Sequence, residues 1–174
     1  MTPKTGDRVP AGLFVVLAGA AGGTVATLAM SVLMLAGGAL GLMGTQPPRR
    51  VVDKVADEVI PGATDPGAAD PDARDAAASM LHVAIGAVAG ALFALGRSAS
   101  EATRSPSRGP LLGAVFGLAF WAVNYMALAP AVNLLPPPTR DRPGRPPVMV
   151  AAHLVYGLTS AVVSDRLLAR LRGR

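Results

Sequence analysis

Charged residues are missing from four long stretches of the chain, and these stretches predict membrane-spanning helices. The first is free of charge from Arg8 to Arg49, well beyond the roughly 20 apolar residues that a bilayer requires. The predicted spans cover residues 11–38, 76–96, 109–129 and 147–166. We therefore expect an all-α fold, an integral membrane bundle of four transmembrane helices. It would form a single membrane domain over residues 11–174, after an N-terminal tail of residues 1–10.

The first connecting segment divides into two parts of different character. Residues 49–60 alternate valines with charged residues so that Val51, Val55 and Val59 share one helical face, which predicts an amphipathic helix at the membrane interface. Residues 61–74 are rich in Asp, Pro, Gly and Ala and predict a flexible loop. We expect Asp72 or Asp75 to cap the next helix, in preference to a calcium site built from the carboxylates of this loop.

The distribution of charge limits the expected partners and indicates how the protein is oriented in the membrane. The net charge is +5, but the basic residues lie beside apolar runs, where they anchor helices to lipid headgroups, so nucleic acid is not an expected partner. Nine Lys and Arg flank the spans on the side of both termini and seven on the other, which favours cytoplasmic termini. A cleaved signal peptide is a competing interpretation of the first apolar run, which however continues far past the Ala18-Gly19-Ala20 site.

The two halves of the chain resemble copies of one helical hairpin. Gly23 precedes Pro47 by the same 24 residues that separate Gly113 from Pro137, and each second helix carries a His-x-x-x-Gly motif. Two motifs in the same order predict tandem hairpin repeats. Small residues spaced by four also predict close helix packing. The packing residues are Gly19, Gly23, Gly86, Gly90, Gly113, Gly117 and Gly157.

Polar residues inside the spans form one candidate site. Both histidines lie about six residues inside a span from the same membrane face, which places them at one depth of roughly 9 Å. The predicted intramembrane cluster is His82, His153, Asn124, Tyr125 and Tyr156. The candidate loop arginines above it are Arg49, Arg50, Arg140, Arg142 and Arg145. A structural role, in which each histidine holds helices in register, is favoured over proton or solute handling and over ligation of a b-type haem.

Motifs of enzymes and cofactor sites do not occur in the sequence. It contains no cysteine, no His-Glu-x-x-His, no phosphate-binding glycine loop and no carboxylate inside the four predicted spans except near the end of the last. We therefore predict no catalytic residue, no metal ligand and no cofactor. The expected partner is the lipid bilayer, with another membrane protein or a second copy of the chain as further possibilities.

Several short motifs resemble one known family. They are the run Pro47-Pro48-Arg49 after a Gly-rich helix, His82-x-x-x-Gly86, and Thr139-Arg140-Asp141-Arg142-Pro143 ahead of His153-Leu154-Val155-Tyr156-Gly157. Over about residues 11–165 the chain resembles the YagU-like group of small uncharacterised bacterial inner-membrane proteins. The resemblance implies a bacterial inner membrane and no established activity. We expect a non-enzymatic accessory, assembly or envelope-homeostasis component, and as an alternative a small transporter or channel that uses His82, His153 and Asn124.

Overall fold

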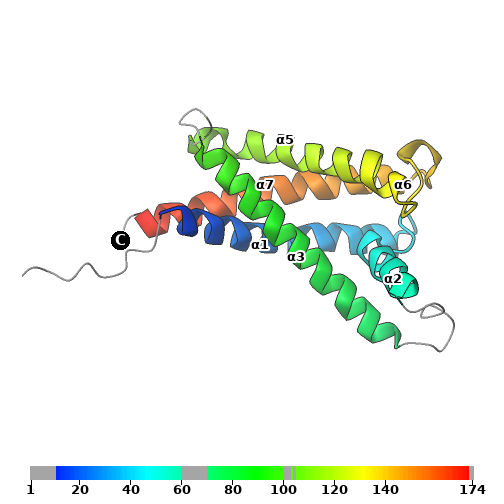
Figure 1. Ribbon diagram of the computed structural model, residues 1–174. Helices are drawn as coiled ribbons and strands as arrows, with labels where there is room; N and C mark the ends of the chain where they lie inside the picture. The colour runs from blue at the N-terminus through cyan, green and yellow to red at the C-terminus, as the bar shows by residue number, and fades with distance from the viewer. Residues whose placement is uncertain (1–10, 60–69, 100–102, 104, 173–174) are drawn as a thin grey trace, which may run out of the picture.

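The computed structural model describes residues 11–59, 70–99, 103 and 105–172, and this part of the chain is helical (Figure 1). Its helices are α1 (Ala11–Ala39), α2 (Pro47–Val59), α3 (Pro71–Ser98), α5 (Gly109–Trp121), the π-helix η2 (Ala122–Leu128), α6 (Ala129–Ala131) and α7 (Arg145–Arg172), with 3-10 turns η1 (Pro106–Arg108) and η3 (Pro138–Arg140). Four helical segments of this part are long and apolar enough to cross a membrane: α1, α3, the run from α5 to α6, and α7. The predicted four-helix membrane bundle is confirmed.

The helix boundaries differ from the prediction in the first loop. Helix α3 begins at Pro71, so the last residues of the segment predicted as a flexible loop, 61–74, are helical instead. Its N-cap is Asp70, whose Oδ1 accepts a hydrogen bond of 3.0 Å from the backbone N–H of Asp72. The prediction that Asp72 or Asp75 caps the helix was wrong, because Pro71 favours the first helical position instead of breaking the helix. Residues 60–69 and the predicted tail 1–10 lie outside the described residues.

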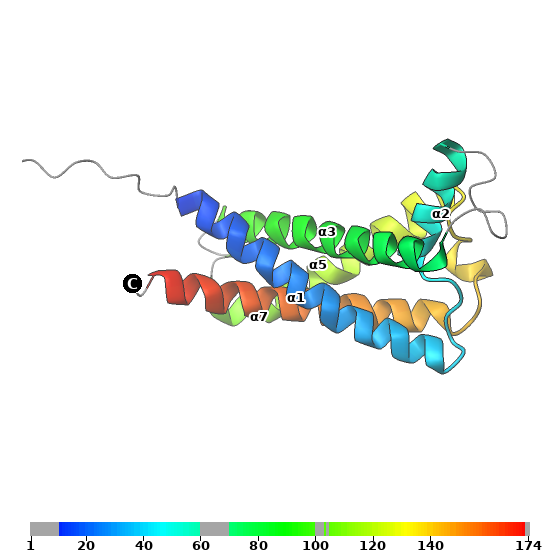
Figure 2. The same ribbon diagram turned by 90° about the horizontal axis from the view of Figure 1, so that it is seen from below.

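The long helices are arranged as two hairpins joined along their first and last members. Helix α1 packs against both α3 and α7, and α5 packs against α7. Figure 2 shows α1 crossing the bundle between these neighbours. In Figure 1, α3 and α5 lie close together where η1 connects them and separate toward the end that carries α2. The first hairpin, α1 with α3, therefore meets the second, α5 with α7, mainly through α1 and α7.

Glycines close both hairpins in the same way. A Cβ added to Gly23 would overlap the carbonyl oxygen of Gly86, and a Cβ added to Gly113 would overlap that of Gly157. The other predicted packing residues, Gly19, Gly90 and Gly117, also face backbone atoms of the opposing helix. The hydrophobic effect does not drive helices together inside a bilayer. Their association depends on dispersion contacts, which small residues increase because they let the backbones approach. All seven predicted packing glycines therefore lie at the two hairpin interfaces.

The first helices of both hairpins end in the same hydrogen-bonded motif. At the end of α1 the N–H of Leu42 bonds to the carbonyl of Gly37, and Gly41 has a φ of 71°. At the end of α6 the N–H of Leu134 bonds to the carbonyl of Ala129, with Asn133 at a φ of 53°. These bonds define the Schellman motif. In this motif a residue in the left-handed conformation turns the chain, so that N–H groups at the turn bond to carbonyls at the end of the helix.

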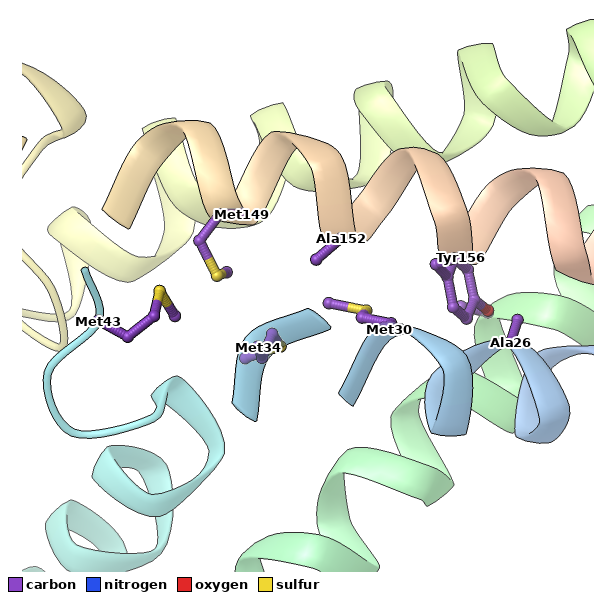
Figure 3. Packing of buried hydrophobic residues seen from close by; sticks show 8 residues of the cluster. Ala26, Met30, Met34, Met43, Met149, Ala152 and Tyr156 are labelled. Atoms are coloured by element: carbon purple, nitrogen blue, oxygen red, sulfur yellow. The ribbon is translucent and has the colours of Figure 1, made fainter. Parts of the chain in front are cut away.

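The core between the hairpins is rich in methionine (Figure 3). Met30 and Met34 project from α1 toward Met149 and Tyr156 of α7, and all four are at most 5% exposed. Methionine is flexible and polarisable, so it adapts to irregular apolar shapes. This cluster forms the floor of the candidate site.

Candidate functional site

A cavity of about 210 Å³ lies between the two hairpins. Its walls come from α1, α2, α3, α7, the run from α5 to α6 and the residues that follow α6. All five members of the predicted polar cluster line it: His82, His153, Asn124, Tyr125 and Tyr156. The rest of the lining is largely apolar and includes Met30, Met34 and Met149. The structure thus brings together side chains that the sequence places at one depth.

His153 is fixed in the wall of the cavity by its own helix. Its ring is 6% exposed, and Nδ1 lies 2.8 Å from the carbonyl oxygen of Met149 one turn earlier. A carbonyl oxygen only accepts hydrogen bonds, so Nδ1 carries the proton and donates. The structure pairs His153 with no carboxylate among the described residues, so the ring is neutral and its Nε2 is an acceptor.

His82 is less tightly held than His153. Its Nδ1 lies 3.4 Å from the hydroxyl of Ser31 on α1, and the side chain is half-buried. It also lines a second cavity, of about 720 Å³, between α1, α2 and α3. That cavity is more polar and contains Gln46, Arg49 and both Asp53 and Asp75. His82 therefore stands at the boundary between an apolar and a polar cavity.

Two of the cluster residues belong to the π-helix of the third span. Asn124 donates from Nδ2 to the carbonyl oxygen of Phe120 at 2.8 Å, which leaves Oδ1 as its acceptor. The hydroxyl of Tyr125 donates to Oδ2 of Asp141 at 2.5 Å, outside the predicted cluster. π-Helical turns are rare and occur frequently at functional sites. A hydropathy pattern does not reveal this change of hydrogen bonding.

Tyr156 joins the two hairpins across the core. Its hydroxyl donates to the carbonyl oxygen of Gly86 at 2.7 Å, and Figure 3 shows the ring reaching from α7 toward α3. Gly86 also opposes Gly23 and Thr27 of α1. Three helices thus meet at the glycine of the first His-x-x-x-Gly motif.

The candidate loop arginines are mostly engaged in structural contacts. Arg145 is 3% exposed and forms an ion pair of 2.9 Å with Asp141, whose side chain is 5% exposed. Arg142 donates to the carbonyl oxygen of Met43 at 2.6 Å, and Arg50 to that of Leu134 at 3.4 Å. These bonds tie the two predicted loops to each other and to the bundle.

The remaining two arginines differ from each other. Arg49 pairs with Asp53 and with Asp75, which fastens α2 to the start of α3. The pKa of Arg49 is raised above its ordinary value, mainly by the hydrogen bond to Asp53 and next by the hydrogen bond to Asp75. Arg140 is exposed at the end of η3. The five arginines therefore do not form one anion-binding cluster.

Asp141 is a key residue that sequence reasoning missed. It accepts hydrogen bonds from Tyr125, from the backbone N–H of Arg142 and from Arg145. Burial would raise the pKa of its carboxyl, but these bonds and the charge of Arg145 outweigh burial and hold the pKa below its ordinary value. One signal was present in the sequence, since Asp141 lies only four residues before Arg145 and the two charges are opposite.

A second ion pair, also missed, lies at the opposite end of the bundle. Arg97 of α3 pairs with Asp165 of α7 at 2.5 Å and donates to the backbone carbonyls of Thr103 and Ser105. Its guanidinium also lies 5.8 Å from the centre of the Phe93 ring. Asp165 was a clear signal in retrospect, because a carboxylate at the end of a span requires a partner.

These features define a four-span helical membrane protein with a largely apolar cavity between two hairpins. The chain belongs to the DUF6789 family, a family of unknown function, whose model matches residues 13–172. No curated protein and no solved structure matches the chain.

Proposed function

We propose that this protein is a non-enzymatic membrane protein that acts by binding, and that its inter-hairpin cavity receives an apolar molecule from the bilayer. The observation that carries this proposal is the cavity of about 210 Å³ lined by methionines and aromatic rings. Binding pockets for small molecules are typically concave and apolar, with a few placed polar groups. Here the polar groups are those of the predicted cluster.

The position of the cavity provides a route from the membrane. The hairpins touch where the rings of Phe93 and Phe116 lie 5.0 Å apart, and α3 then diverges from the third span toward α2 (Figure 1). Ile85 of α3 lines the cavity and is 43% exposed. An opening at this position faces lipid, so an apolar molecule reaches it without crossing water.

The chemistry of the cavity favours binding over catalysis. His153 donates to Met149, and Tyr125 donates to Asp141, so two of the candidate groups are held in structural bonds. Among the described residues, no three His, Cys, Asp or Glu side chains are grouped to hold a metal ion. These bonds pair neither His153 nor Tyr125 with a nucleophile, and the contact of His82 with the hydroxyl of Ser31 is long, at 3.4 Å.

Duplication of a single hairpin accounts for the architecture. Gly23 with Gly86 and Gly113 with Gly157 are equivalent contacts, and both first helices end in a Schellman motif. The second copy has two more residues between its glycine and this motif. A π-helix takes more residues per turn, so η2 accommodates added residues in the third span.

The expected location is a bacterial inner membrane with both termini in the cytoplasm, as the YagU-like resemblance and the distribution of Lys and Arg imply. The chain contains no cysteine, so single introduced thiols can be labelled without background. We expect a membrane-impermeant reagent added from the periplasm to label Thr139→Cys and to leave Ser107→Cys unlabelled. The reverse pattern would contradict this orientation.

Native mass spectrometry tests the binding proposal. The detergent-solubilised protein is mixed with methyl hexadecyl ether, an uncharged probe, and we expect a one-to-one adduct. Ile85→Trp should abolish the adduct because the larger ring fills the mouth of the cavity. Val88→Trp is the matched control, one turn along α3 and 61% exposed. Equal adducts in the wild type and both variants would place the probe on the outer surface and reject the proposal.

A transporter or channel is the second candidate, because His82 lines both the apolar and the polar cavity. Such a residue could pass a proton or solute between them. Liposome flux measured against pH tests this role. Loss of flux in a His82→Ala, His153→Ala double variant would support transport, and an absence of flux in the wild type would exclude it.

Two further possibilities receive less support. A cavity of about 210 Å³ is little larger than one of about 150 Å³ that holds a single benzene, whereas haem contains four pyrrole rings. We therefore do not propose a haem-binding subunit. The bilayer is the partner that the binding proposal requires, and contact with another membrane protein or with a second copy stays a prediction.

A further inference from the structure

We infer that the ligand of the inter-hairpin cavity is an uncharged lipid whose head donates a hydrogen bond, namely a long-chain alcohol. This inference rests on the proposed binding function and names the chemistry of the ligand. It depends on three properties of the cavity: the absence of charge on its described lining, the acceptors that it presents, and its size.

The charge of the lining excludes an ionic head. Apart from His82 and His153, the described residues that line the apolar cavity are not ionisable at neutral pH, and His153 is neutral. An anionic head would lose its hydration without gaining a cation, which costs several kcal/mol. In the adjoining polar cavity Arg49 is paired with two carboxylates, Asp53 and Asp75, so that region does not favour an anion either.

Two polar residues of the lining, His153 and Asn124, call for a donor. The proton on Nδ1 of His153 is directed to the carbonyl of Met149, so Nε2 is left as an acceptor. The Nδ2 of Asn124 donates to the carbonyl of Phe120, so Oδ1 is left as an acceptor. Both residues line the same cavity. A hydroxyl group satisfies such an acceptor, whereas a ketone, ester or ether oxygen is itself only an acceptor.

The size of the cavity indicates how much of the ligand enters. A volume of about 210 Å³ accommodates slightly more than one benzene ring, by comparison with a cavity of about 150 Å³ that binds benzene. Only the head and the first part of a chain fit. The remainder of the chain lies in the bilayer, beyond the partly exposed Ile85 at the mouth.

The test compares probes that share one chain and differ in the head. 1-Hexadecanol, methyl hexadecyl ether and palmitate are titrated into the full-length protein, and the adducts are measured by native mass spectrometry. We expect hexadecanol to bind about three- to tenfold more tightly than the ether, the range that one net hydrogen bond provides. Palmitate should bind more weakly than hexadecanol. Equal affinities for alcohol and ether, or tighter binding of palmitate, would overturn the inference.

Two variants locate the acceptor. Asn124→Leu removes Oδ1, and His153→Phe removes Nε2 together with the bond to Met149 and keeps an aromatic ring in the wall. At least one of them should reduce the preference for alcohol over ether to about onefold, while Leu111→Ala, a substitution outside the lining of the cavity, should leave the preference unchanged. If both acceptor variants keep the full wild-type preference for alcohol over ether, the inference is overturned. If a variant fails to fold, the comparison of the three probes on the wild-type protein still tests the inference.

The outcomes separate the two proposals. Loss of all three adducts would reject the binding function itself, together with the ligand class. Adducts of equal strength would retain the binding function and reject the hydroxyl-bearing ligand alone.

Discussion

The two hairpins are closed by the same glycine contacts but differ in how their loops and histidines are held. In the second hairpin, Arg145 and Asp141 form an almost fully buried ion pair. In the first, Arg49 pairs with Asp75, whose side chain is 68% exposed. His153 is buried and bonded to its own helix, whereas His82 is half-buried between two cavities.

The contacts that the hairpins share concern helix packing, and the features in which they differ concern the candidate site. The glycine contacts are equivalent in both hairpins because backbones must approach closely in lipid. The second hairpin then adds a rigid, buried polar network, and the first leaves its histidine accessible from two cavities. The first hairpin is therefore the side that would admit a ligand, whereas the acceptors that would position it, on His153 and Asn124, belong to the second hairpin.

The largest predicted effect concerns the two loop ion pairs. Asp141→Asn leaves Arg145 buried without its counter-charge, and we expect a loss of about 3–5 kcal/mol in the free energy of unfolding. The corresponding change in the first hairpin, Asp75→Asn, should cost at most about 1 kcal/mol because that pair is exposed to solvent. Equilibrium unfolding in detergent measures both. Similar losses would contradict the contrast between the hairpins.

The same pair predicts a dependence on pH. The pKa of Asp141 is lowered in the folded protein, so its contribution is complete above the ordinary pKa of 3.8 and is lost as the pH falls through the lower, folded value. The stability gap between the wild type and Asp141→Asn should therefore shrink below about pH 3.8. A gap that stays constant in acid would show that the charge of Asp141 is not its cause.

Glycine substitutions give the next largest effect. In Gly157→Ala the new methyl group meets the backbone carbonyl of Gly113, which cannot move away, and we expect a loss of about 1–3 kcal/mol. In Gly86→Ala the new methyl group overlaps the hydroxyl of Thr27, which is buried and donates to the carbonyl of Gly23, so we expect a loss of similar size. Gly96→Ala has nothing within 4 Å and is the control, with no loss expected. Thermal unfolding ranks the three variants.

The smallest predicted effect distinguishes the two histidines. His153→Ala removes a buried ring that packs 6.3 Å from Phe120 and should cost about 1–2 kcal/mol more than His82→Ala. The half-buried His82 has only a contact of 3.4 Å with Ser31. Chemical unfolding of the two variants tests this order. Greater destabilisation by His82→Ala would contradict the prediction that His153 contributes more to stability.

Sequence predicted the four spans, because they depend on where charge is absent, and it selected five polar side chains that line one cavity. It did not predict the ion pair of Arg97 with Asp165, whose members come from different spans and meet only after the helices pack. It also misplaced the start of α3, where Pro71 was assigned to a loop although proline suits the first helical turn. The π-helix at Asn124 was missed because a shift in hydrogen bonding leaves no hydropathy signature.

The most direct test of the cavity as a binding site is photolabelling in liposomes with a hydrocarbon that carries a diazirine and no head group. Labelled positions are read by peptide mass spectrometry. Met30 and Met149 are both 5% exposed, so bilayer lipid reaches them only through the cavity. We predict label at both methionines as well as at Leu111 and Val115, which are exposed at 68% and 56% on α5. Label confined to Leu111 and Val115 would contradict the account.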